Sequence, residues 1–217
     1  MRHVVRAALI ALLSVIGPTS PGLTAEGEPT AIIKQTTTSV LEVLENPQLQ
    51  GPEKRDERQG QLRDIADRVF DWQEIARRAL AMHWRERTPQ EQKEFVDLFK
   101  ELVQRAYMSR LEGAVGERKD ILYVGEQEDG SRATVKTKVV TKRSQEVPIE
   151  YRLHQVNGRW QIYDAVIEGV SLVANYRSQF NRILVSSSYQ ELIRRLKAKQ
   201  VEEPAPPSKE KPAKKGQ

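Results

Sequence analysis

Two alternating segments joined by Asn157-Gly158 limit the fold of this chain more than any other feature. Asn-Gly is well suited to a type I′ hairpin turn because both residues tolerate a positive φ. In the first segment the apolar side chains occupy every second position: Val147, Ile149, Tyr151 and Leu153. In the second segment one side of the strand is predicted to carry Trp160, Ile162, Asp164 and Val166. A period of two predicts strands with one buried face, so we expect an antiparallel hairpin here.

Helices and strands occupy separate blocks of the chain. A second hairpin is predicted from residues 121–127 and 132–142, which flank the turn Asp129-Gly130. Helical periodicity precedes and follows the strands, at residues 30–45, 53–68, 72–83, 88–112, 171–185 and 188–200. The short connections between strands predict an antiparallel four-stranded sheet, and the block order predicts an α+β fold with helices against that sheet.

The clearest helix start lies at Thr88-Pro89-Gln90-Glu91. Thr88 and Glu91 have the spacing of a capping box, in which each side chain bonds the backbone N–H of the other residue. Pro89 occupies the first helical position, where its missing N–H costs nothing. Gly113 and Gly116 are predicted to end this helix. Three more helices are predicted to begin after capping residues, Asp71, Ser171 and Ser188.

The two ends of the chain differ from its centre. Residues 1–25 have the features of a signal peptide, with Arg2 and Arg6 before an apolar run of about ten residues, which is too short to span a bilayer. An uncleaved membrane anchor is the alternative. Residues 201–217 are rich in Pro, Lys and Glu without apolar periodicity, which predicts a disordered tail. One domain is therefore expected at residues 26–200, in an exported protein.

Composition excludes several kinds of function. The chain has no cysteine and only 3 histidines, which leaves no thiolate chemistry and makes a histidine-built metal site a poor fit. It contains no Gly-rich phosphate loop, no G-x-S-x-G elbow and no H-E-x-x-H pair. Most of the +5 formal charge lies in the two ends, so a nucleic-acid partner is not expected.

The segments VPIEYRL and YDAVIEGVSLVANYRSQF, within residues 147–180, resemble the MlaC or toluene-tolerance auxiliary family. This resemblance implies a cone-like fold, related to that of nuclear transport factors, in which a curved sheet is wrapped by N- and C-terminal helices around a hydrophobic pocket. It implies a monomeric, periplasmic carrier without a cofactor, a metal or enzymatic activity. Its ligand would be a diacyl phospholipid, and its partners an inner-membrane ABC transporter complex and an outer-membrane lipoprotein complex.

The predicted lipid-binding residues are the apolar side chains on the facing sides of the sheet and the helices. They are Phe95, Leu98, Phe99, Leu102, Val103, Val135, Val139, Ile149, Tyr151, Leu153, Trp160, Ile162, Leu172, Val173, Tyr176 and Phe180. By themselves these residues fit a filled core better than an open one. The resemblance favours the open interior, because family members bury acyl chains there, and each buried methylene contributes about 0.8 kcal/mol.

Asp164 is the one candidate catalytic residue, since it shares the predicted apolar side of its strand. A cone-shaped isomerase could use such a carboxylate as a base. The structural alternative is that Asp164 bonds the backbone near the bend at Glu168-Gly169 or pairs with Arg177. Arg177 could also meet a lipid phosphate. Two further alternatives stay open, a carrier of hopanoid-type lipids and a protein-binding adaptor with a filled core.

Overall fold

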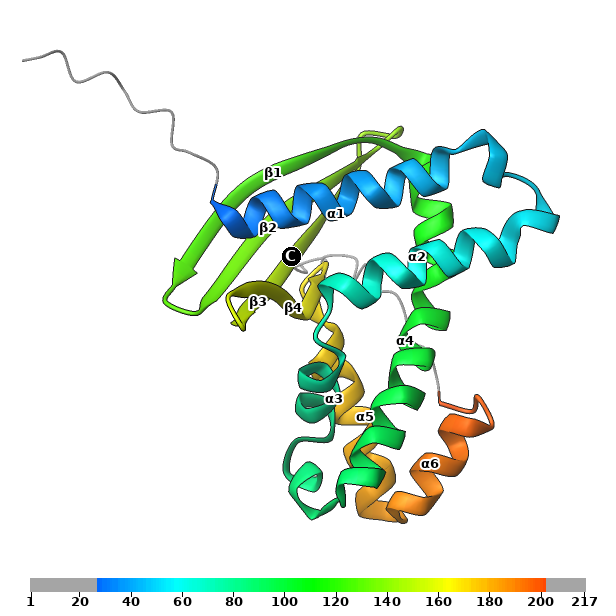
Figure 1. Cartoon of the computed structure of the whole chain (residues 1–217), viewed down its shortest axis with the longest axis vertical. Helices are drawn as coiled ribbons and strands as arrows, with labels where there is room; N and C mark the ends of the chain where they lie inside the picture. Colours follow the sequence, from blue (N-terminus) through cyan, green and yellow to red (C-terminus); the bar gives the residue numbers. More distant parts are fainter. Residues whose placement is uncertain (1–26, 202–217) are drawn as a thin grey trace, which may run out of the picture.

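The computed structural model describes residues 27–201, so the predicted signal peptide and nearly all of the predicted tail lie outside the described residues. The described helices are α1 (Glu28–Glu45), α2 (Arg55–Val69), α3 (Trp72–Leu80), α4 (Pro89–Glu117), α5 (Leu172–Ser186) and α6 (Tyr189–Lys197). Short 3-10 turns connect some of them: η1 (Pro47–Leu49), η2 (Pro52–Lys54) and η3 (Ala81–Glu86). The strands are β1 (Arg118–Asp129), β2 (Arg132–Thr141), β3 (Glu146–Val156), β4 (Arg159–Ile167) and β5 (Val170–Ser171). The predicted α+β class is confirmed (Figure 1).

The sheet is an antiparallel meander with the order β1-β2-β3-β4-β5, so five strands replace the predicted four. Asn157 and Gly158 have φ values of 50° and 75°, which confirms the hairpin between β3 and β4. The fifth strand likewise follows a turn made by two residues with positive φ. Glu168 and Gly169 also have positive φ values, 49° and 84°, so the chain reverses there instead of merely leaving the sheet. Residues 170–171 then pair with the end of β4.

A β-bulge at Tyr163 changes which side chains of β4 face the core. Leu153 pairs with Ile162, but its neighbour Arg152 pairs with Asp164, so Tyr163 is the extra residue. Directly paired residues share a face of the sheet, and an extra residue shifts the alternation by one. Asp164 therefore lies on the face of Arg152, opposite to Leu153 and Ile162. The prediction that Asp164 shares a side with Ile162 is wrong for this reason.

The predicted capping residues are confirmed. At the start of α4, the Glu91 N–H donates to Thr88 Oγ1 at 3.2 Å, and the Thr88 N–H donates to Glu91 Oε2 at 2.8 Å. Asp71, Ser171 and Ser188 accept the corresponding bonds in α3, α5 and α6. The end of α4 was wrongly predicted, since Gly113 and Gly116 lie inside the helix. A side chain at either position would meet open space, so no close packing requires a glycine there.

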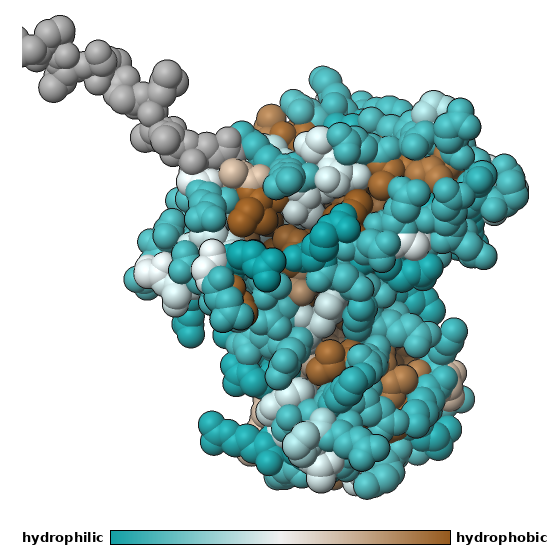
Figure 2. All heavy atoms as spheres, viewed as in Figure 1, coloured by the Kyte–Doolittle hydropathy of each residue, from teal (hydrophilic) through white to brown (hydrophobic). Residues whose placement is uncertain are grey.

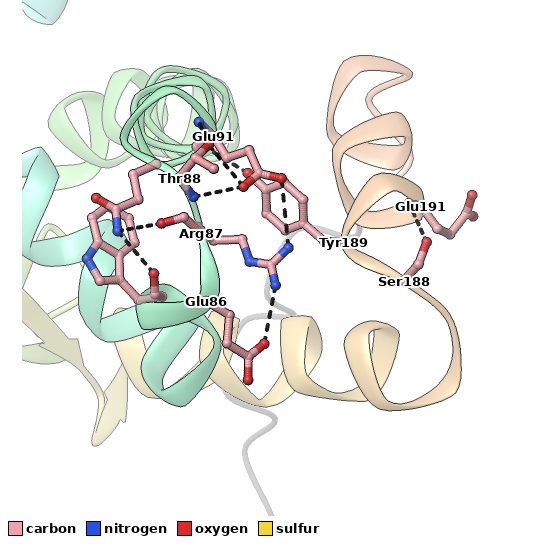
Figure 3. A network of polar contacts seen from close by, with 9 residues as sticks. Glu86, Arg87, Thr88, Glu91, Ser188, Tyr189 and Glu191 are labelled. Atoms are coloured by element: carbon pink, nitrogen blue, oxygen red, sulfur yellow. Dashed lines mark hydrogen bonds and ion pairs between the residues drawn. The ribbon is translucent and has the colours of Figure 1, made fainter.

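Arg87 and Tyr189 link α4 to α6 beside this capping box (Figure 3). The Arg87 guanidinium lies 4.7 Å from the centre of the Tyr189 ring, and the Tyr189 hydroxyl donates to the Glu91 carbonyl oxygen at 2.8 Å. Burial, followed by the charges of Glu91 and Glu94, raises the pKa of Tyr189 to about 12. The neutral phenol is therefore a fixed part of the contact between these two helices.

The elements form two lobes. In the sheet lobe, α1 and α2 run across one face of the sheet; in the helical lobe, α3, α5 and α6 gather around one half of α4 (Figure 1). The C-terminal helices thus wrap around α4 more than around the sheet. Of these C-terminal helices, α5 contacts the sheet at β4 and at β5, which it follows in the chain, and α6 packs on α4 and α5. The N-terminal helices α1 and α2 therefore cover more of the sheet than the C-terminal helices α5 and α6 do.

Candidate functional site

A cavity of about 560 Å³ lies between α1, α2 and the start of β4. We call it the sheet-side cavity. Its apolar lining residues are Ile32, Ile65, Val69 and Trp160. Its polar lining residues are Glu28, Gln35, Thr36, Ser39, Asp67, Arg68, Arg159 and Gln161. Hydrophobic residues are visible between α1 and α2 in Figure 2. The volume is within the range of small-molecule sites, roughly 300–1,000 Å³.

Short polar side chains on α1 explain why this space is open. Ile32, Thr36 and Ser39 are three or four residues apart, so they share the face of α1 that lines the cavity. The neighbouring Ile33 is 2% exposed and packs against the sheet. Helix α1 therefore rests on the sheet through Ile33, while Thr36 and Ser39 are too small to fill the space beside it.

Part of the predicted lipid-binding set lies in the core of the sheet lobe. Its buried residues are Ile33, Val69, Ala133, Val135, Leu153, Trp160 and Ile162, and Tyr151 packs against them. Trp160 is the one predicted residue that lines the sheet-side cavity. Val139 and Ile149 lie further along the sheet and are only half-buried. Burial raises the pKa of Tyr151 to about 12, since a phenolate there would be desolvated.

The other predicted residues lie in the core of the helical lobe. Those that are buried are Phe95, Phe99, Leu102, Val103, Leu172, Val173, Tyr176 and Phe180, and Leu98 packs against them. The Phe99 ring lies 5.0 Å from Tyr176 and 5.1 Å from Phe180, both edge to face. Phe95 is 5.5 Å from Phe180 in the same arrangement. These rings contact one another and fill the centre of the helical lobe.

The structure therefore divides the predicted residues between two buried clusters. Phe70 contacts both clusters and stacks on Trp72, with the ring centres 5.2 Å apart. Contact between any of these side chains and a ligand stays a prediction. The sequence prediction missed Ile32, Ile65 and Val69 as site residues. A signal for the cavity was the interruption of the α1 apolar pattern by Thr36 and Ser39.

Asp164 is buried, and its carboxylate is held by hydrogen bonds within the protein. It is 5% exposed, and its carboxylate accepts bonds from the Ser171 hydroxyl at 2.6 Å, the Val173 N–H at 3.1 Å and Arg152 Nη1 at 3.2 Å. These bonds join β3, β4 and the first turn of α5. The structural alternative for Asp164 thus has direct support, with Arg152 in place of the predicted Arg177. A carboxylate with three donors has little capacity left to take a proton from a substrate.

A second depression, of about 740 Å³, lies between α3, η3, α5 and strands β3 and β4. We call it the arginine cleft, because its lining includes Arg77, Arg78, Arg85, Arg152 and Arg177. Asp164 is the one carboxylate among its lining residues, which also include exposed Met82 and small side chains such as Ala81 and Ala174. The two depressions share no lining residue.

Two of these arginines are partly neutralised by one carboxylate of α3. Arg77 and Arg78 donate to Glu74 at 2.6 and 2.7 Å. Burial alone would raise the pKa of Glu74, but the two guanidinium groups outweigh it and the pKa is lowered. Arg78 also lies 4.2 Å from the centre of the Tyr163 ring. The bulged residue of β4 therefore fixes one wall of the arginine cleft.

The histidines that the structure describes make ordinary contacts. His154 Nε2 lies 3.0 Å from Asp71 Oδ2, and His83 Nε2 lies 3.1 Å from Asn181 Oδ1. Within residues 27–201, His, Asp and Glu form no group of three that could hold a metal ion. No helix in that range is long and apolar enough to cross a membrane.

The fold and its cavity define a small α+β protein with a ligand-sized space beneath two helices. The chain belongs to the MlaC family, since the family described as MlaC protein matches residues 34–198. It is also similar to the toluene tolerance protein ttg2D of Pseudomonas putida. The two are 24% identical over 182 residues, which cover 83% of this chain and 82% of that protein.

The fold is also similar to that of a solved phospholipid-binding protein from Ralstonia solanacearum, whose structure contains a phospholipid. The TM-score is 0.68 at 24% sequence identity, and the match covers 78% of this chain and 95% of the other. At this identity the similarity establishes the fold alone. The family match over residues 34–198 confirms the resemblance that residues 147–180 indicate.

Proposed function

We propose that this protein is a phospholipid carrier that holds acyl chain in the sheet-side cavity. One observation carries the proposal: an open space with Ile65, Val69 and Trp160 in its lining lies over the sheet of an MlaC-family fold. The phospholipid in the Ralstonia solanacearum protein supports the choice of ligand. The filled aromatic core of the helical lobe makes the sheet lobe the better location.

Burial of hydrocarbon supplies the binding energy. Each methylene that leaves water for an apolar surface contributes about 0.8 kcal/mol, so an acyl chain binds without polar contacts. The polar lining carries both signs of charge, with Glu28 and Asp67 against Arg68 and Arg159. A head group at the mouth would meet no dominant charge. We therefore expect weak selectivity among head groups.

For the second acyl chain of the phospholipid to enter the sheet-side cavity, α1 and α2 must separate. Both helices contact the sheet, and their far ends are joined through η1 and η2. Leu49 and Leu62 lie with Ile65 in a small cluster at that joined end. We expect α1 to pivot there, so that the cavity widens at the end nearest the start of α1.

The test compares two tryptophan substitutions on α1. Thr36→Trp fills the cavity, whereas Thr38→Trp places the same side chain on the exposed side of the same helix. Protein purified from a Gram-negative host is extracted with organic solvent, and the lipid is identified and quantified by mass spectrometry. We expect diacyl phospholipid in the wild type and in Thr38→Trp, with near-complete loss in Thr36→Trp.

Three results would count against this proposal. Protein recovered without lipid would contradict a carrier, and equal loss in both variants would contradict the location. Hopanoid-type lipid in the extract would support that alternative cargo instead of phospholipid.

We further propose that the protein moves phospholipid through the periplasm between an outer-membrane lipoprotein complex and an inner-membrane ABC transporter. The predicted signal peptide at residues 1–25 and membership of the MlaC family support this role. Cell fractionation should recover the mature protein from the periplasm. Crosslinking in cells should then capture both membrane complexes; capture of neither would oppose the shuttle and leave lipid binding unaffected.

A further inference from the structure

We propose that the arginine cleft is a second binding site, separate from the sheet-side cavity, and that it takes a phosphate group. The phosphate would belong either to a phospholipid head group at a membrane surface or to a small soluble phosphate compound. Side chains from four parts of the fold line the cleft: α3, η3, α5 and the β3–β4 hairpin.

Positive charge in the cleft exceeds what Asp164, the one carboxylate in its lining, neutralises. Arg85 and Arg177 are exposed and form no ion pair with any residue from 27 to 201. Arg152 is held at 3.2 Å from Asp164 and 3.0 Å from Glu150, which fixes its orientation. Cations gathered in a concave surface repel one another, and a bound anion removes that repulsion. The forked guanidinium matches the oxygen atoms of a phosphate group.

Two backbone segments border the cleft. In the first turn of α5, the Val173 and Ala174 N–H groups already donate to the Asp164 carboxylate and the Ser171 hydroxyl, so they are not open to an anion. Ala81, in the opposite wall, has a φ of 51°, a conformation that is unfavourable for a residue with a side chain. Strain of this kind persists where the surrounding structure holds it in place, often at ligand sites.

The cleft is on the other face of the β3–β4 hairpin from the sheet-side cavity. The bulge at Tyr163 turns Asp164 toward Arg152, away from Leu153 and Ile162 in the core of the sheet lobe. The two sites also share no lining residue, so the proposed phosphate belongs to a second molecule and not to the lipid in the sheet-side cavity.

The concave shape favours a small group over a folded protein. A volume of about 740 Å³ admits a phosphate with its attached glycerol or sugar, and small residues such as Ala81 and Ala174 leave it room. Met82 is 73% exposed beside the arginines, so a cationic surface and an apolar side chain occur together. This combination suits the head-group region of a membrane.

The experiment uses the purified full-length mature protein with its natural lipid load. Inorganic phosphate and glycerol 3-phosphate are titrated by calorimetry. Flotation then measures binding to phosphatidylcholine vesicles with and without phosphatidylglycerol. The double variant Arg85→Gln/Arg177→Gln should weaken binding by about tenfold or more, since each arginine supplies a charged hydrogen bond. The control Arg55→Gln/Arg143→Gln removes equal charge at exposed positions outside the cleft and should bind like the wild type.

Each of the two measurements, calorimetry and flotation, either identifies the source of the phosphate or contradicts the proposed site. Binding to anionic vesicles alone supports a lipid head group, and binding to glycerol 3-phosphate or phosphate supports a soluble compound. Equal weakening in both double variants, or no binding in either arm, overturns the proposal. Tighter binding of poly-glutamate than of every phosphate probe overturns it in favour of an acidic protein partner. Lipid extracted from Arg85→Gln/Arg177→Gln should equal that of the wild type, so failure here is distinct from failure of the carrier proposal.

Discussion

The sheet lobe and the helical lobe contain similar apolar side chains but fill space differently. In the helical lobe Phe99, Tyr176 and Phe180 interlock with ring centres 5.0 to 5.6 Å apart. In the sheet lobe the corresponding layer is α1, which sets Thr36 and Ser39 beside the apolar surface of Trp160. The two lobes therefore differ in the size of the side chains on the helix that covers each core.

This difference assigns separate tasks to the lobes. A filled core is sensitive to substitution, because every ring contacts its neighbours and a smaller side chain leaves a void. The helical lobe therefore serves as the rigid part of the molecule. A layer with short side chains loses little when a ligand enters, because few contacts are broken. We therefore expect stability to depend mainly on the helical lobe and lipid retention mainly on the sheet lobe.

The largest expected effect is on stability in the helical lobe. Phe99→Ala removes a ring that is 1% exposed, and large-to-small changes of phenylalanine in a core cost about 3–5 kcal/mol. Urea unfolding followed by circular dichroism measures the change. The matched control is Ile32→Ala in the sheet lobe, a half-buried cavity residue whose loss should cost less than half as much. Equal costs for the two variants would remove the distinction between the lobes.

A smaller effect is expected where the lobes meet. Asp164→Asn replaces the carboxylate that holds Arg152 and the start of α5, and a hydrogen bond to a charged group contributes about 1.5–3 kcal/mol. We expect thermal stability to fall by an amount in this range, with the lipid load unchanged. Asp64→Asn, an exposed site, is the control. Unchanged stability together with loss of a catalysed reaction would revive the enzyme alternative.

The smallest effect is an alkaline loss of stability to which both lobes contribute. The pKa values of Tyr151 and Tyr189 are raised to about 12, whereas an unfolded tyrosine titrates near about 10. Between these values the unfolded chain releases protons that the folded protein keeps, so stability falls as the pH rises. The stability that the two neutral tyrosines contribute is fully present below the pKa of an unfolded tyrosine, about 10. Tyr189→Phe, which also removes one hydrogen bond of about 1 kcal/mol, should flatten this slope.

Unfolding measured at several pH values checks this expectation. Tyr163, which lies at the arginine cleft, provides the control variant Tyr163→Phe. A slope that Tyr151→Phe and Tyr189→Phe both leave intact would contradict the assignment. A slope changed by only one of them would show which lobe limits stability in alkali.

Local signals in the sequence predicted the secondary structure well. Asn157-Gly158 and the Thr88 capping box involve residues close in sequence, so their geometry follows from local chemistry. The bulge at Tyr163 was not predictable in this way, because alternation continues through it and only the register against β3 reveals it. The fifth strand was missed because Glu168, a residue that seldom adopts positive φ, does so here.

The site was harder to predict than the fold. The apolar residues of both lobes follow the same helical and strand periodicities, so sequence alone placed them on one continuous interior surface. Which helix covers which face depends on long-range packing. Only Trp160 of the predicted set lines the sheet-side cavity, and Ile65 and Val69 reach it from α2.

Quenching of tryptophan fluorescence by brominated phospholipid tests the central claim most directly. The chain has 3 tryptophans: Trp72, Trp84 and Trp160. Trp160 lines the sheet-side cavity, and Trp84 is buried in the core of the helical lobe. One variant keeps only Trp160 and another keeps only Trp84, with phenylalanine at the other two positions. Bound lipid with brominated acyl chains should quench Trp160 strongly and Trp84 weakly; stronger quenching of Trp84 would place the acyl chains in the helical lobe and contradict this account.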